Sequence, residues 1–157
     1  MGIALTLHLL AATVWVGGMF FAFACLRPAA AELDPAVRLR LWSDTLARFF
    51  RWVWLAIALL LATGFWMIFN VPGGMAAVGM HVHLMLGIGV LMMLLAAHVY
   101  FAPLRRLRRD VAGSHWADAG RALGQIRAFI GVNLGLGLAV LAIASGGRYF
   151  FAMRELQ

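Results

Sequence analysis

The chain has 157 residues, of which 64% are hydrophobic and only 12% are charged, and its formal net charge is +7. A water-soluble domain carries about 25% charged residues, so this chain has too few polar side chains to cover a surface that faces water. The composition therefore excludes an ordinary soluble domain and indicates a membrane protein. At this length we expect a single domain, residues 1–157.

All thirteen basic residues are arginines, and they lie in the breaks between apolar runs. We attribute them to membrane orientation and do not expect a nucleic-acid partner. The single cysteine, Cys25, excludes an internal disulfide and a CxxC metal motif. Every Asp and Glu lies outside the apolar runs, so acid–base catalysis by a carboxylate within the membrane has no candidate residue.

Four apolar runs are long enough to cross a hydrocarbon core, which requires about 20 helical residues. The expected spans are residues 2–25, 52–70, 80–102 and 128–147. A Pro-Gly-Gly break at Pro72 separates the second from the third, because Pro lacks an N–H donor and Gly tolerates turn dihedral angles. We expect the first run to be a retained helix, because a signal peptide has a basic start and an apolar region of only about 7–15 residues. The fold class is all-α, a polytopic membrane protein with a four-transmembrane-helix bundle.

The segment before the second span is also expected to be helical. Asp34 is a suitable N-cap residue and Pro35 suits the first helical position. Asp44 lies four residues before Arg48, a spacing that supports a helix. We interpret this segment as an amphipathic lead-in that lies at the membrane interface. Four tryptophans near the expected interfaces are interpreted as aromatic anchors: Trp42, Trp52, Trp54 and Trp66.

The distribution of arginines predicts the orientation. The region between the first two spans contains Arg27, Arg38, Arg40, Arg48 and Arg51. The region between the last two contains Arg105, Arg106, Arg108, Arg109, Arg121 and Arg127. The middle connection contains none, and only Arg148 and Arg154 follow the last span. The positive-inside rule therefore places both termini and the middle connection on the periplasmic side of a bacterial inner membrane.

Histidines are the informative polar residues, because ionisable groups within membrane spans are costly and usually functional. His8 lies about two turns inside the first span, and His81 and His83 open the third. Since these two spans run in the same direction, His8 and His83 are expected at similar depth. Two imidazoles that face each other can clamp a haem iron or serve as two ligands of a copper ion.

His98 lies fifteen residues beyond His83, which places it about 22 Å deeper and on the same helix face. We interpret it either as a cofactor ligand or as a hydrogen-bond partner of a backbone carbonyl or of Asn133. No second histidine lies in a span at that depth, so the sequence predicts at most one bis-histidine haem. Trp15 follows His8 by two helical turns and can pack against a cofactor or a neighbouring helix. His115 is interpreted as a solvated surface residue.

The third span begins with further candidate ligands. His81 points about 160° away from His83 around the helix, and we expect it to lie nearer to water with Met80. Thioethers suit Cu(I), and imidazole suits copper as well. Small residues allow close helix packing, and those singled out are Gly17, Gly18, Gly64, Gly131 and Gly135, of which the last two form a GxxxG pair.

The first span contains Leu7-His8-Leu9-Leu10 and then Val14-Trp15-Val16-Gly17-Gly18-Met19, a histidine followed about seven residues later by Trp-x-Gly-Gly. This pattern resembles the copper-resistance D (CopD) family of membrane proteins. The third span, Met80-His81-Val82-His83 through His98, is similar to CopD and to the related HemJ-type protoporphyrinogen oxidases. In the HemJ pattern His81 matches the family histidine, and His83 stands in place of a lysine. The resemblance covers most of the chain, which looks like a minimal four-helix module without the extra helices of full-length CopD proteins, and it implies copper movement or haem b binding.

We therefore expect a CopD-like membrane protein that binds or transports copper through an outward-facing His/Met site. The alternatives are a b-type haem protein in electron transfer or haem-precursor oxidation, and an accessory subunit without a cofactor. The candidate cofactor-binding residues are His8, His83, Trp15 and His98, and the candidate metal ligands are His8, His83, His81 and Met80. An enzymatic role is left open and a non-enzymatic one is favoured; an enzyme would be a haem-dependent membrane oxidoreductase. The expected partners are the bilayer, the metal ion or haem, and a second copy of the chain or a periplasmic protein.

Overall fold

The computed structural model describes residues 2–70, 72, 74–76 and 78–152. Every regular element among these residues is helical, which confirms the all-α prediction. In chain order the elements are α1 (Gly2–Phe21), the π-helical turn η1 (Ala22–Leu26), α2 (Arg27–Ala31), α3 (Pro35–Phe69), the 3-10 turn η2 (Gly74–Ala76), α4 (Met80–Phe101), α5 (Pro103–Ala112) and α6 (Trp116–Ala152). Within the described residues, four stretches are long and apolar enough to cross a membrane: Gly2–Ala31, Pro35–Phe69, Met80–Ala112 and Trp116–Gly146. The chain is a multi-pass membrane protein.

The helices extend well beyond the spans that hydropathy marks. α3 begins at Pro35, directly after Asp34, although the Asp34 side chain makes no capping hydrogen bond. The lead-in is helical, as predicted, and forms the first half of one continuous helix. At 1.5 Å per residue, the 35 residues of α3 reach about 52 Å, whereas a hydrocarbon core is about 30 Å thick. The charged residues of this first half lie on a helix that continues out of the apolar span.

The first span does not end at Cys25. The chain continues through η1 into α2, which ends at Ala31. Pro28 lacks an N–H donor and its ring crowds the carbonyl of Ala24, so a regular α-helical ladder cannot run through this point. The π-helical turn η1 ends at Leu26, two residues before the proline, and accommodates the break.

The region expected as the third loop is also mostly helical. Pro103 ends α4 and opens α5, and α6 begins at Trp116, before the predicted start of the fourth span. α5 is strongly amphipathic: Leu104 and Leu107 are buried, whereas the arginines between and after them are exposed. Tertiary packing of this apolar face explains why a segment with four arginines in ten residues forms a helix.

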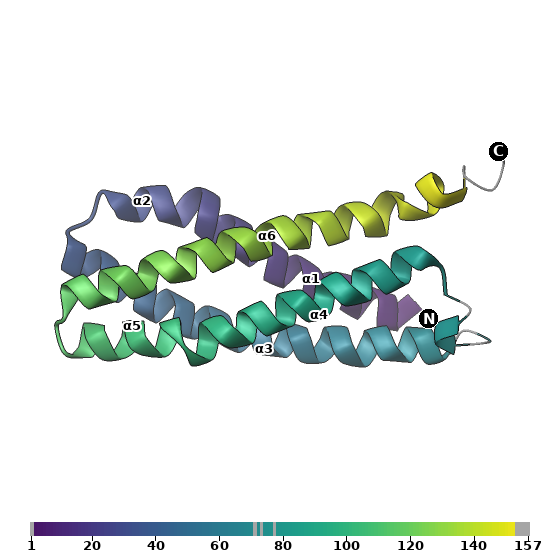
Figure 1. Ribbon diagram of the computed structural model, residues 1–157, viewed down its shortest axis with the longest axis horizontal. Helices are drawn as coiled ribbons and strands as arrows, with labels where there is room; N and C mark the ends of the chain where they lie inside the picture. Colours follow the sequence, from purple (N-terminus) through teal and green to yellow (C-terminus); the bar gives the residue numbers. More distant parts are fainter. Residues whose placement is uncertain (1, 71, 73, 77, 153–157) are drawn as a thin grey trace.

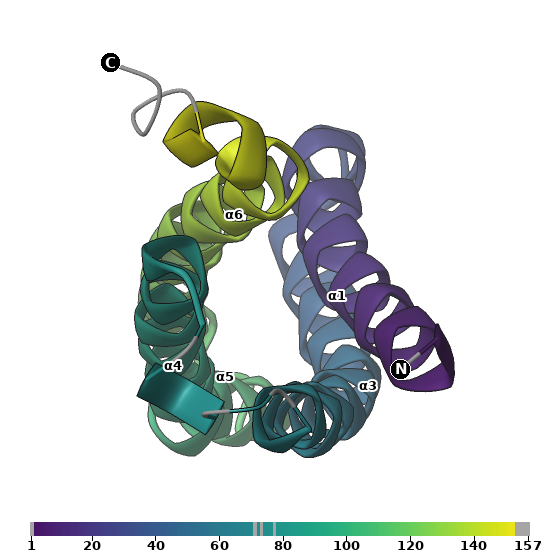
Figure 2. The same cartoon turned by 90° about the vertical axis from the view of Figure 1, so that its right-hand side faces the viewer.

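The helices form two antiparallel pairs. α1 packs along α3, and α4 packs along α6, while α5 packs against α6 and α3. Figure 2 shows α1 and α3 on one side of the bundle and α4 and α6 on the other. The start of α1, the end of α6 and η2 lie at one end, which we call the outer end (Figure 1). α2, α5 and the first turns of α3 and α6 lie at the other end, which we call the arginine end.

The most closely packed part of the described bundle is at the arginine end. Trp42, Leu46, Leu104, Leu107 and Ile126 are all at most 2% exposed. Trp42, predicted as an interfacial anchor, is therefore a core residue, and the Arg127 guanidinium lies 5.3 Å from its ring centroid. Trp54 also packs inside, in edge contact with Tyr100. Trp52 and Trp66 remain exposed and keep the anchor interpretation.

Only some of the small residues lie at helix contacts. A Cβ added at Gly18 would lie 2.3 Å from Cε2 of Phe49 on α3, whereas the neighbouring Gly17 has nothing within 4 Å. In the GxxxG pair, a Cβ added at Gly131 would lie 3.3 Å from Cε2 of Phe23. Gly135 is exposed, and a Cβ added there would have nothing within 4 Å. The motif therefore does not form a two-glycine contact within this chain.

The glycine pair on α1 provides a matched test of the α1–α3 contact. Gly18→Ala should destabilise the folded protein by about 1–3 kcal/mol, because the new methyl group displaces the Phe49 ring. Gly17→Ala should leave stability unchanged or raise it, because alanine favours helix and the position is open. The measurement is the thermal unfolding midpoint of each variant in the same detergent. Equal midpoints for the two variants would contradict the described contact.

The orientation remains a prediction from the arginines, eleven of which lie on helices toward the arginine end. We expect a reporter fused after Gln157 to be active when the reporter requires the periplasm. A second fusion at Gly113, in the connection between α5 and α6, should be active only with a cytoplasmic reporter. Cytoplasmic activity of the first fusion would show that the bundle is inserted the other way.

Candidate metal site

His8 lies on α1 near the outer end, and its side chain faces α3. The imidazole is partly buried, and its Nδ1 atom lies 2.8 Å from Oγ1 of Thr63. Thr63 is only 7% exposed, and its hydroxyl donates a hydrogen bond of 2.6 Å to the carbonyl of Leu59 one turn earlier in α3. His8 is thus joined to the α3 backbone through one hydroxyl group.

Gly64 lies beside the imidazole, and a Cβ added there would be at ordinary van der Waals distance from the ring. A Cβ built at this position would lie 3.4 Å from Cε1 and 3.9 Å from Nδ1 of His8. The Nδ1–Cε1 edge of the ring therefore rests on the α3 backbone beside Thr63. Gly64 appears in the sequence as a small residue without an assigned role, and here it lies beside a candidate ligand.

Met80, His81 and His83 open α4 at the same outer end. Met80 is 66% exposed, His83 is exposed and His81 is half-buried. A Cβ at Gly79 would lie 2.7 Å from Cε1 of His81, and Nδ1 of His83 lies 3.4 Å from the Gly79 carbonyl, which is too long for a strong hydrogen bond. Both imidazoles therefore neighbour Gly79, the residue that precedes α4.

The structure does not bring His8 into contact with His83. α1 packs on α3 and α6, whereas α4 packs on α6 and α5. Among the described residues, no group of three or more His, Cys, Asp or Glu side chains is arranged to hold a metal ion. The convergence of His8 and His83 remains a prediction that depends on a movement of α4 or on a ligand that draws the two together.

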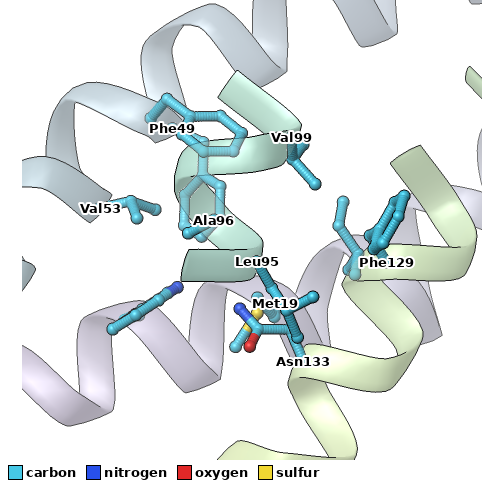
Figure 3. A pocket seen from close by; sticks show the side chains of 11 residues that line it. Met19, Phe49, Val53, Leu95, Ala96, Val99, Phe129 and Asn133 are labelled. Carbon is cyan, nitrogen blue, oxygen red and sulfur yellow. The ribbon is translucent and has the colours of Figure 1, made fainter. Parts of the chain in front are cut away.

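Trp15 and His98 lie away from these residues. Trp15 is 3% exposed and lines a cavity of about 20 Å³ in the middle of the bundle, together with Met19 and Asn133 (Figure 3). The remaining lining residues are Phe49, Phe50, Val53, Leu95, Ala96, Val99, Phe129 and Ile130. A cavity of this size holds about one water molecule. His98 is exposed, and its ring lies 5.0 Å from that of Phe129, so the suggested hydrogen bond to Asn133 does not form.

The cavity does not fit a haem. Its volume is that of a water molecule, and the buried Asn133 Oδ1 that lies among its lining residues and has no hydrogen-bond partner is not a good iron ligand. The residues around it are otherwise aromatic and aliphatic. No haem-dependent step is therefore assigned to this cavity.

Thr63 is the site residue that sequence reasoning missed. It lies six residues before the end of α3, and His8 lies six residues after the start of α1, so antiparallel helices place them at one depth. A Thr-Gly pair inside a run without charged residues was the available signal. Depth alone could not show that the His8 face of α1 meets this face of α3.

Comparison with known proteins gives one family. The family model for copper resistance protein D matches residues 43–146, which cover most of α3, all of α4 and α5, and most of α6. His81, His83 and His98 lie inside the matched range, whereas His8 and the Trp-Gly-Gly motif of α1 lie outside it. No curated protein and no solved structure matches the chain.

Proposed function

Because this chain belongs to the copper resistance protein D family, a family of membrane proteins associated with copper resistance, we propose that it binds copper at its outer end. The proposed ligands are His8 and His83, with His81 and Met80 nearer to water. In the membrane orientation that the arginines predict, this end faces the periplasm.

The observation that carries the proposal is that the candidate copper ligands and most of the arginines lie at opposite ends of the bundle. His8, His81, His83 and Met80 all lie at the outer end, where the structure describes no arginine side chain (Figure 1). The arginines of α2, α3 and α5, with Arg121 and Arg127 of α6, lie toward the opposite end. A cation that approaches the outer end therefore meets these neutral donors and is far from eleven of the thirteen arginines.

The chemistry of the donors favours copper. The outer end offers imidazole nitrogens and a thioether, which suit Cu(I), and no carboxylate side chain among the described residues. Hard cations such as Mg²⁺ and Ca²⁺ require oxygen ligands. The donor set thus discriminates against the most abundant divalent cations.

Binding, more than conduction through one bundle, is the core of the proposal. The cavity inward of His8 holds about one water, and it is lined mainly by apolar side chains. Movement of copper past this point would require the helix pairs to separate or a second copy of the chain to complete a path. We propose that the outer site accepts copper from the periplasmic side and hands it on from there.

Single replacements of the histidines test the assignment. His8→Ala and His83→Ala should each abolish stoichiometric Cu(I) binding, because each removes a principal ligand. His81→Ala and Met80→Leu should weaken binding less, and His98→Ala should retain it. His115→Ala, exposed at the arginine end, is the matched control. Bound copper is measured on membrane-inserted protein by competition with a Cu(I) chelator, with circular dichroism to confirm folding.

Full copper retention in His8→Ala or in His83→Ala would show that the ligand assignment is wrong. A visible spectrum of the same wild-type sample distinguishes bound haem from bound copper. A Soret band with sharp bands on reduction would overturn the copper proposal in favour of haem, whereas a colourless protein that binds copper stoichiometrically supports it.

A further inference from the structure

The Thr63 hydroxyl has one proton and two candidate acceptors at short distance, the Leu59 carbonyl oxygen and Nδ1 of His8, whereas the Leu60 carbonyl oxygen is 3.5 Å away. Oγ1 of Thr63 lies 2.6 Å from the Leu59 carbonyl oxygen and 2.8 Å from Nδ1 of His8. A threonine hydroxyl has one proton to donate and can accept from a second donor. Both short distances are satisfied only if a proton lies between each pair of atoms.

The Leu59 carbonyl has no proton, so the Thr63 hydroxyl must be the donor of the 2.6 Å hydrogen bond. Nδ1 of His8 must then carry the proton of the 2.8 Å hydrogen bond and donate it to Thr63. If Nδ1 were instead an acceptor, Thr63 would turn its proton toward it, and two oxygen lone pairs would face each other at 2.6 Å. The full set of hydrogen bonds selects one tautomer of the imidazole.

We propose that Thr63 holds His8 in the neutral tautomer with the proton on Nδ1, so that Nε2 is the copper-binding atom. This inference rests on the proposed function and names the atom that performs it. Thr63 is a positioning residue, since it touches the ligand and not the metal. Among the described residues, no hydrogen bond occupies Nε2, and its lone pair is available.

The residues around His8 determine the orientation of its imidazole ring as well as the position of its proton. Gly64 lies beside the Nδ1–Cε1 edge of the ring, and Nε2 is more than 4 Å from a Cβ built at Gly64. Thr63 is buried and bound to the helix backbone, so its oxygen cannot move to follow a different imidazole orientation. Metal-binding histidines commonly donate their second ring N–H to such a partner, which orients the ring and raises its basicity. A hydroxyl performs this role without bringing a charge into the bilayer.

The tautomer can be read without any metal. Full-length protein labelled with ¹⁵N at histidine and reconstituted in lipid nanodiscs gives ring nitrogen shifts that distinguish protonated from unprotonated atoms. In the copper-free protein at a pH where His8 is neutral, Nδ1 should be protonated and Nε2 unprotonated. Thr63→Ser should preserve this pattern, whereas Thr63→Val, which has nearly the same shape, should lose it. A protonated Nε2 in the wild type would overturn the proposal.

Copper affinity provides the second measurement. Thr63→Val should weaken Cu(I) binding by about 10–100-fold, the usual effect of removing such a partner, and Thr63→Ser should restore most of it. Thr13→Val is the matched control, because Thr13 makes the same hydrogen bond to the carbonyl four residues earlier, at 2.8 Å, but touches no histidine. Thr13→Val should bind copper like the wild type.

The outcomes separate this inference from the function on which it rests. If the wild type binds no copper, the proposed function fails, while the nitrogen shifts still decide the tautomer. If the wild type binds copper and Thr63→Val binds it equally well, the function stands and the role of Thr63 is refuted. A loss in both Thr63→Val and Thr63→Ser would also refute it, because the hydroxyl would then not be the relevant group.

Discussion

The structure depends on one constraint: inside the hydrocarbon core, no water is present to complete a hydrogen bond. Backbone groups therefore pair within helices, and each polar side chain in a span requires a partner on the protein. Thr13 and Thr63 both meet this constraint by donating to the carbonyl four residues earlier. Thr63 then has an oxygen that can accept, and the imidazole of His8 uses it. The same constraint that forms the helices thus selects the orientation of the candidate ligand.

The arginine end is stabilised by a different means, because the chain has thirteen arginines and only six acidic residues. Salt bridges cannot pair most of these guanidinium groups. Several lie over aromatic rings instead: Arg27 over Phe23, Arg40 over Trp116, and Arg127 over Trp42, at 5.2 to 5.4 Å from the ring centroids. Guanidinium groups can stack on aromatic faces while their stems cover apolar surface. This explains why Trp42 is buried although it contacts a guanidinium group, and why the end that carries most of the charge is also closely packed.

Hydropathy was sufficient to predict four spans and their order, because the absence of water leaves long apolar helices as the only solution. It could not predict where the helices end. The charged residues of the first half of α3 interrupt the apolar run, but tertiary packing of Leu39 and Leu46 continues the helix. The site shows the same limit. Counting residues along the spans predicted a similar depth in the membrane for His8 and His83. Depth does not determine which helices are neighbours. The face of α1 that carries His8 meets α3, and only the assembled fold reveals Thr63.

The exposure of the candidate ligands orders them from the surface of the bundle toward its interior. Met80 is 66% exposed, His83 is exposed, His81 is half-buried, and His8 is partly buried against α3. Moving a bare cation into a medium of low dielectric constant is costly unless donors replace its hydration shell. Donors arranged in this order would replace the water around copper one ligand at a time, with exposed groups first and His8 last. His8 would then form the last bond to copper, at the position where the fewest water molecules compete for the ion. For that step an imidazole with its lone pair already on Nε2 is required, since a proton on that atom would first have to leave.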